Sequence, residues 1–229
     1  MKHLLLTTIA AVLLVGCGPS TPDISIHDAA LEDNIEVVKQ HLAAGADVNN
    51  KGLFGGTPLI LAESREIIEL LIVAGADVNY SPKNGITPLA RAVIRADKES
   101  AELLISSGAD VNSKDRQGHT PLDTAKSSLD LLKIDEEIGL DMDDIAASKA
   151  ALKEITDLLR KHGGKYGTIH GAAGGGDVEV VKEFLAAGAD VNEKDDWGKT
   201  PIDLADGETS DLLRKHGGKT GEELKAEGK

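Results

Sequence analysis

Short blocks of apolar residues at helical spacing recur along most of the chain. Val37, Val38 and Leu42 form one such block, and Val180, Val181 and Leu185 form another with the same pattern. This spacing predicts short amphipathic helices that turn one side towards a core. Glycine suits the left-handed residue that ends a helix, and we expect helices to end at the glycines at 45, 75, 108 and 188.

Two motifs recur at a fixed distance from each other. Gly-Ala-Asp-Val-Asn stands at 45–49, 75–79, 108–112 and 188–192, and Thr-Pro-Leu or Thr-Pro-Ile begins at Thr57, Thr87, Thr120 and Thr200. Each threonine follows the glycine of the preceding motif by 12 residues. A threonine hydroxyl can cap a helix N-terminus, and proline fits the first helical position, where its missing N–H is harmless. Four equal intervals indicate a structural repeat.

These motifs resemble those of the ankyrin-repeat family, in which Thr-Pro-Leu opens an inner helix and a second helix ends at Gly-Ala-Asp-Val-Asn. A β-hairpin called a finger then leads to the next threonine. The resemblance implies an all-α solenoid of about six helix-turn-helix repeats joined by β-hairpin fingers. It covers residues from about 26 to 219.

Repeat length is irregular in two places. The second repeat is three residues short between Ala62 and Gly75. The fourth carries 22 additional residues, an insertion at about 127–148 that is rich in acidic side chains. We expect the insertion to be a solvated acidic helix or loop with one apolar side.

A duplication divides the repeats into two groups. The nine residues 157–165 recur as 211–219, and Gly167 holds the threonine position only four residues after Gly163, so one finger is missing there. We therefore assign repeats 1–4 to 26–165, and repeats 5–6 with a C-terminal cap to 166–229. Because two repeats alone bury little core, we expect the second group to continue the stack with a bend rather than to form a separate lobe.

The first 16 residues have the features of a signal peptide. Lys2 and His3 precede an uncharged apolar run of twelve residues that ends at Val15. This run is too short to span a bilayer core of about 30 Å as a helix, but it suits the core of a signal peptide. It leads into Leu-Val-Gly-Cys17, which resembles the lipobox of bacterial lipoproteins. The resemblance implies cleavage before Cys17 and a lipid on the Cys17 thiol.

The predicted lipid indicates where in the cell the protein is located. Residues 17–25 would form a lipidated tether to a bacterial envelope membrane, since several acyl chains anchor a protein essentially permanently. Gly18 follows the cysteine where aspartate would signal inner-membrane retention, and this favours the outer membrane, facing the periplasm or the cell surface. The alternative is an ordinary secretory signal that happens to end near a cysteine.

Composition narrows the possible partners. With 39 acidic and 25 basic side chains the net charge is −14, which argues against a nucleic-acid surface and against docking on anionic lipid by charge. A single cysteine rules out an internal disulfide and a cysteine-cluster metal site. Aromatic residues make up only 2% of the chain, so alanine, leucine, isoleucine and valine must build the core.

The sequence lacks the common motifs of catalysis and cofactor binding. Gly-Lys-Thr occurs at 198–200 and 218–220, but Glu193 and Leu213 stand where a phosphate-binding loop needs its first glycine. The histidines lack metal-ligand spacing, the acidic insertion fits no EF-hand register, and no nucleophile elbow occurs. We predict a protein that is not an enzyme, with no cofactor, no metal site and no small-molecule substrate. The alternative is an accessory or enzyme-like envelope protein whose acidic insertion is a metal-binding or active loop.

The fingers carry the positive signal for a binding function. Aromatic and basic side chains fall in these exposed segments, and tryptophan and tyrosine are frequent energetic anchors of protein interfaces. We predict that the partner protein contacts Phe54, Tyr80, Arg116, Trp197 and Lys199, with the concave face extending this surface through Leu31, Glu32, Ile94 and Arg95. The alternative is that the aromatics pack on neighbouring fingers, above all Tyr80, which would suit a purely structural spacer.

Overall fold

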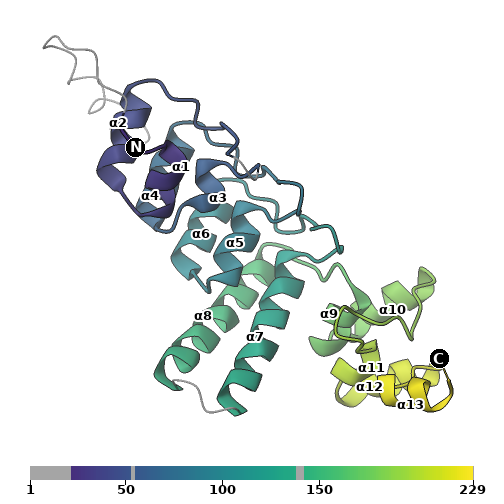
Figure 1. Ribbon diagram of the computed structural model, residues 1–229. Helices are drawn as coiled ribbons and strands as arrows, with labels where there is room; N and C mark the ends of the chain where they lie inside the picture. Colours follow the sequence, from purple (N-terminus) through teal and green to yellow (C-terminus); the bar gives the residue numbers. More distant parts are fainter. Residues whose placement is uncertain (1–21, 53–54, 138–141, 229) are drawn as a thin grey trace, which may run out of the picture.

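The computed structural model describes residues 22–52, 55–137 and 142–228, which form a row of helix pairs (Figure 1). The first helix of each pair stacks on the first helix of the next pair, which gives an inner layer. The inner helices are α1 (Ile26–Leu31), α3 (Pro58–Leu61), α5 (Pro88–Ile94), α7 (Pro121–Glu137), α9 (Ile169–Gly174) and α11 (Pro201–Leu204). The outer helices are α2 (Ile35–Ala43), α4 (Arg65–Val73), α6 (Lys98–Ser106), α8 (Met142–Lys161), α10 (Val178–Ala186) and α12 (Gly207–Lys215), and α13 (Gly221–Ala226) follows them.

Local sequence explains where the helices begin and end. Thr87 accepts a hydrogen bond from the Ala90 amide at 3.2 Å, and prolines stand at the first position of α3, α5, α7 and α11. The glycine after each outer helix of the first three repeats has a positive φ, for example +79° at Gly45. The Gly45 and Ala46 amides donate to carbonyls of the last turn of α2, which closes the helix end. The predicted helix ends at the glycines are confirmed.

The core consists of thin layers of small and aliphatic side chains. In the inner helices Ala29, Leu89, Ala125 and Ala172 are fully buried, and they meet larger aliphatic residues of the outer helices such as Leu104. Alanine at the inner positions lets neighbouring repeats approach closely. Small and aliphatic side chains fill most of these layers, which accounts for the low aromatic content; among the described aromatics, Tyr166 is buried in the core.

The asparagine that closes each Gly-Ala-Asp-Val-Asn motif joins one repeat to the next. The Asn49 side chain donates to the Gly75 carbonyl at 3.1 Å and accepts from the Asp77 amide at 2.8 Å. Asn79 makes the same two bonds to Gly108 and Asp110, at 3.0 and 2.7 Å. This ladder satisfies backbone groups at the end of each outer helix that would otherwise lack a partner.

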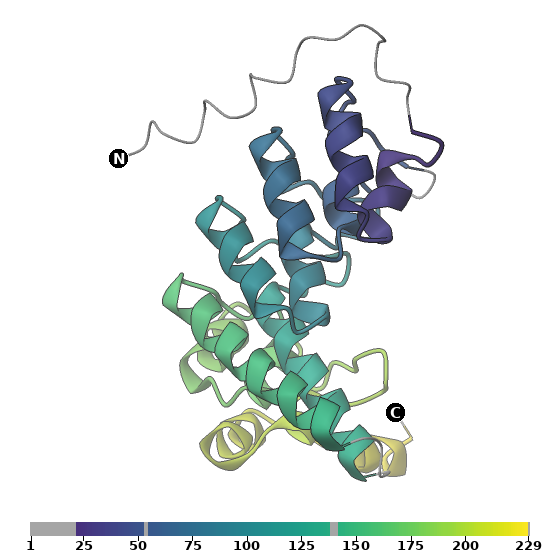
Figure 2. The same cartoon turned by 90° about the vertical axis from the view of Figure 1, so that its left-hand side faces the viewer.

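The insertion in the fourth repeat lengthens both helices of that repeat. Helix α7 has 17 residues, against 4 to 7 for the other inner helices, and α8 has 20, against 9 for the other outer helices. They pack along each other, and α8 buries Leu152, Ile155 and Leu159 (Figure 2). Lys98 of α6 pairs with Glu154 of α8 at 2.5 Å, which ties the long pair to the preceding repeat.

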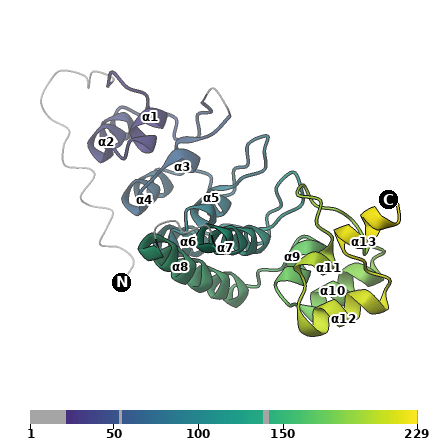
Figure 3. The same ribbon diagram turned by 60° about the horizontal axis from the view of Figure 1, so that its bottom comes forward.

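The connection between repeats four and five, residues 163–168, is called the seam here. Inner helices α7 and α9 pack across it, but outer helices α8 and α10 do not pack together as other neighbouring outer helices of the described chain do. Helices α9 to α13 therefore turn away from the line of the first four repeats (Figures 1 and 3). The inner stack continues through the seam while the outer layer opens there.

The fingers are loops, each with a tight turn at its tip. In the 112–120 finger the Asp115 amide donates to the His119 carbonyl at 2.9 Å, and in the 192–200 finger the Asp195 amide donates to the Lys199 carbonyl at 2.9 Å. Within the described residues no β-strand is formed, so the β-hairpin form of the fingers stays a prediction. Nor do the described residues include a helix that is both long and apolar enough to cross a bilayer.

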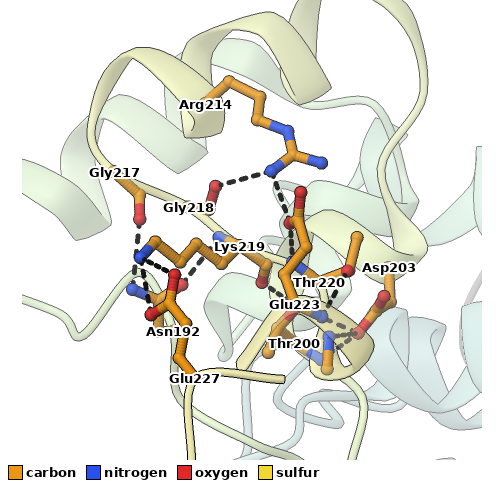
Figure 4. A network of polar contacts seen from close by, with 11 residues as sticks. Asn192, Thr200, Asp203, Arg214, Gly217, Gly218, Lys219, Thr220, Glu223 and Glu227 are labelled. Carbon is orange, nitrogen blue, oxygen red and sulfur yellow. Dashed lines mark hydrogen bonds and ion pairs between the residues drawn. The ribbon is translucent and has the colours of Figure 1, made fainter. Parts of the chain in front are cut away.

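A polar network closes the C-terminal end of the stack (Figure 4). Arg214 of α12 donates to the Glu223 carboxylate of α13 at 2.6 Å, and Lys219 pairs with Glu227 at 2.5 Å. The Asn192 side chain accepts from the Lys219 amide at 2.7 Å, as its counterparts do in the ladder. Helix α13 thus covers the last repeat.

Candidate interaction site at the seam

The Asp123 carboxylate holds the seam together in place of a finger. Asp123 of α7 is 2% exposed. One carboxylate oxygen accepts the amides of Thr120 at 2.9 Å and Gly167 at 2.6 Å, and the other accepts the Thr168 hydroxyl at 2.7 Å. Donors from Thr120, Gly167 and Thr168 around one buried carboxylate fix the start of α9 against α7.

The same arrangement recurs at the C-terminal cap, where the duplicated nine residues end. Asp203 accepts the amides of Thr200 at 2.8 Å and Gly221 at 2.9 Å (Figure 4). Burial alone would raise the pKa of the Asp203 carboxyl, but these hydrogen bonds outweigh it and lower the pKa. Thr-Pro-x-Asp occurs at 120–123 and at 200–203, and in both places its aspartate binds the segment that follows without a finger.

A cavity of about 600 Å³ lies beside the seam, and it is called the seam pocket here. Its walls come from α7, α9, α10 and the tips of the 112–120 and 192–200 fingers. These two fingers are neighbours in space because no finger separates repeats four and five (Figure 3). The missing finger leaves the space that the seam pocket occupies.

Apolar side chains line much of the seam pocket. Trp197 is 68% exposed and Leu131 is 52% exposed, while Phe184, Ile169 and Leu204 form deeper parts of the wall. A second cavity of about 190 Å³ shares Leu131 and Trp197 with the first and reaches Ile86 and Ile94 of the third repeat. Both cavities are lined by Trp197 and by residues of the inner helix α7, and the surface that they form together is called the groove here.

Charged groups surround the apolar part of the seam pocket. Lys126 and Asp130 of α7 form an ion pair, and Lys133 also reaches Asp130 at 3.1 Å. On the 192–200 finger, the side chains of Glu193 and Asp196 form no hydrogen bond or ion pair within the described part of the chain. The rim is therefore mixed in charge, with two carboxylates open to a ligand.

The histidines near the seam pocket bond to nearby groups of the chain. His170 Nε2 lies 3.0 Å from the Glu193 carbonyl and 3.2 Å from the Lys199 carbonyl, which anchors the 192–200 finger on α9. His119 Nδ1 lies 3.3 Å from the Asp115 carboxylate in its own finger. No group of three metal-binding side chains occurs among the described residues.

The predicted contact residues do not lie together. Trp197 and Lys199 line the seam pocket, and Arg116 is exposed at the tip of the facing finger. Tyr80 is half-buried, and its hydroxyl donates to the Gly55 carbonyl at 2.7 Å, which is the packing role that the sequence left open. Phe54 and Cys17 lie outside the described residues.

The concave-face residues predicted from the sequence also have different roles. Ile94 is 48% exposed and lines the groove, whereas Arg95 is half-buried and donates to the Ala62 carbonyl at 2.8 Å. Sequence reasoning missed Leu131 and Phe184 as site residues. The missing finger after Gly163 could have indicated these residues, because a gap between neighbouring fingers exposes the helices beneath it.

Comparison with known proteins agrees with this architecture. A model of three ankyrin-repeat copies matches residues 26–115 and 63–134, and a model of many ankyrin-repeat copies matches residues 156–205. The matched stretches together span well over half of the chain. No curated protein sequence matches the chain significantly. The repeated motifs, the stacked helix pairs and these matches together show that the chain belongs to the ankyrin-repeat family.

Proposed function

We propose that the protein is a non-enzymatic scaffold that is displayed on a bacterial envelope membrane and binds a partner protein through its fingers and concave face. Ankyrin repeats are interaction modules, which gives the general function. The observation that carries the proposal is the groove around Trp197, where large apolar side chains remain exposed. Contiguous exposed apolar surface in a soluble domain marks interaction sites.

The rigidity of the stack supports binding by shape. The asparagine ladder and the buried Asp123 fix the positions of neighbouring repeats before a partner arrives. A surface formed in advance loses little conformational entropy on docking, so more of the contact energy appears as affinity. No reactive group is needed for this mechanism.

Display on the membrane rests on the sequence of the N-terminal segment. A lipid on Cys17 would hold the acidic chain at a membrane that it does not bind by charge. Mass spectrometry of the N-terminal peptide from membrane-extracted protein tests this part. We expect a chain that begins at a lipid-modified Cys17, and an unmodified thiol would refute the anchor.

Affinity capture from solubilised envelope tests the binding function. The wild-type chain is expected to retain a specific partner, and the Trp197→Ala plus Phe54→Ala variant is expected to lose it. The Val73→Ala variant is a matched control, because Val73 is an exposed apolar residue on the outer helix α4. If the wild-type chain retains no protein beyond those captured by an unrelated lipoprotein, the scaffold function is wrong.

A further inference from the structure

We propose that the seam pocket binds a short segment of the partner that carries a bulky apolar side chain next to lysine or arginine. This inference rests on the proposed scaffold function and adds the place of binding and the chemistry of the bound segment. Three independent observations carry it: the space left by the missing finger, the exposed tryptophan at its edge, and two rim carboxylates that pair with no described residue.

The seam pocket occupies the space where a finger is missing from the stack. The successive 79–87 and 112–120 fingers touch so closely that a Cβ on Gly85 would lie 2.5 Å from the Asp115 backbone. At the seam the 112–120 and 192–200 fingers instead both line the 600 Å³ cavity. Ligand pockets typically have volumes of about 300 to 1,000 Å³. A partner segment can therefore take the place that a finger occupies elsewhere in the stack.

The apolar wall gives this segment its anchor. Trp197 is 68% exposed at the edge of the pocket, while Phe184 is half-buried in its wall. Most of the Trp197 ring lies in solvent, so the ring contributes little to the stability of the chain itself. A bulky apolar side chain placed against Trp197, Leu131 and Phe184 would remove this surface from water, which is the usual basis of an interface hot spot.

The rim carboxylates set the charge of the segment. The seam pocket is lined by more carboxylates than cations: Asp123, Asp130, Glu193, Asp195 and Asp196 against Lys126, Lys194 and Lys199. Glu193 and Asp196 make no ion pair within the described residues, whereas Lys126 is already paired with Asp130. A cationic side chain beside the apolar anchor would give these two carboxylates partners. The net charge of −14 also attracts a basic segment and repels an acidic one at long range.

The tryptophan provides a direct measurement. Trp197 is the single tryptophan of the chain, so its fluorescence reports the seam pocket alone. Randomised short peptides would be selected by display on the full chain, and the enriched peptides would be synthesised together with versions in which Lys and Arg are replaced by Glu. We expect enrichment of an apolar residue beside Lys or Arg, a saturable shift of Trp197 emission to shorter wavelength, and loss of the shift with the Glu versions.

Variants identify the groups responsible. With a labelled peptide, Trp197→Ala is expected to weaken binding by about tenfold or more, which corresponds to about 1.4 kcal/mol or more. The double variant Glu193→Lys plus Asp196→Lys is expected to weaken it at low salt and to reduce its salt dependence. The matched control Glu66→Lys plus Glu69→Lys makes the same charge change on the outer helix α4, and it is expected to retain most of the affinity.

Each outcome decides one of the two proposals. Selected peptides that are acidic, that lack an apolar residue, or that leave Trp197 emission unchanged overturn the seam pocket as the site, and so does a selection that yields no binder. If envelope capture still retains a partner with Trp197→Ala and with Glu193→Lys plus Asp196→Lys, the scaffold function stands and the pocket assignment fails. If the wild-type chain captures no partner while peptides bind the pocket, the scaffold function fails instead.

Discussion

The Gly167 amide donates to the Asp123 carboxylate at 2.6 Å, and this bond joins two groups of repeats that no finger connects. Asp123 lies on the last inner helix of the first group, and Gly167 lies two residues before the first helix of the second group. A buried carboxylate that accepts several hydrogen bonds can hold such a junction because backbone amides on both sides would otherwise lack a partner away from water.

Replacement of Asp123 is expected to loosen the seam. Asp123→Ala removes the acceptor for the Thr120 and Gly167 amides, and we expect the free energy of unfolding to fall by about 2 to 4 kcal/mol. Asp123→Asn keeps one carbonyl oxygen and should cost less. Urea unfolding followed by circular dichroism measures the change, and hydrogen exchange should increase first in α9 and α10. Equal protection of these helices in wild type and variant would contradict the role of Asp123.

A methyl group at Gly171 is expected to disrupt the same junction, because it would overlap the Asp123 carboxylate. A Cβ at this position would lie 1.8 Å from the Asp123 carboxylate, so Gly171→Ala should destabilise the chain by about 1 to 3 kcal/mol. Gly174→Ala is the matched control in the same helix, because the nearest atoms there belong to the flexible end of Lys126 at 3.1 Å. Thermal unfolding of the two variants distinguishes them. A Gly171→Ala melting temperature at or above that of Gly174→Ala would refute the steric argument.

Arg95 is expected to matter for stability rather than for binding. Its guanidinium donates to the Ala62 carbonyl at the end of the four-residue helix α3 and lies 3.5 Å from Glu63. Arg95→Ala leaves that carbonyl without its charged donor, so we expect a loss of about 1 to 2 kcal/mol in denaturant unfolding. The exposed Arg65 is a control whose replacement by alanine should change stability by less than about 0.5 kcal/mol. Similar losses for the two variants would be unexpected.

Acid is expected to weaken the C-terminal cap. Hydrogen bonds from Arg214 and from the Thr220 amide lower the pKa of Glu223 from an ordinary value of 4.5 to about 2. Because the pKa is lower in the folded than in the unfolded chain, the contribution of Glu223 to stability is complete above about pH 4.5 and disappears as the pH falls towards 2.

The measurement is the difference in free energy of unfolding between wild type and Glu223→Gln over this pH range. The difference should shrink as the pH falls. Glu222→Gln changes the neighbouring carboxyl, which makes no hydrogen bond within the described chain, and its difference from wild type should be nearly constant. A wild-type advantage over Glu223→Gln that persists unchanged at pH 2 would show that the cap does not depend on this carboxylate.

The sequence alone determined the repeats because their signals are local. At the repeated motifs a threonine followed by proline starts a helix and a glycine ends one, and helical spacing marks the buried side of each helix. The equal intervals between these residues indicated a structural repeat, and the resemblance of the motifs implied the ankyrin solenoid, which the tertiary structure and the family matches confirm. The missing finger could also be recognised from the short distance between Gly163 and Gly167.

Only the tertiary structure decided what each exposed residue does. Tyr80 and Trp197 both stand in fingers, but Tyr80 packs on the preceding finger, while Trp197 lies over the gap at the seam. Likewise, Arg95 bonds to the shortened second repeat, while Ile94 beside it faces the groove. These differences depend on which neighbour is present across the stack, and that neighbour lies about 25 to 33 residues away in the chain. The seam pocket has the same origin, because a cavity formed by a missing neighbour is a property of the assembled stack and not of any one segment.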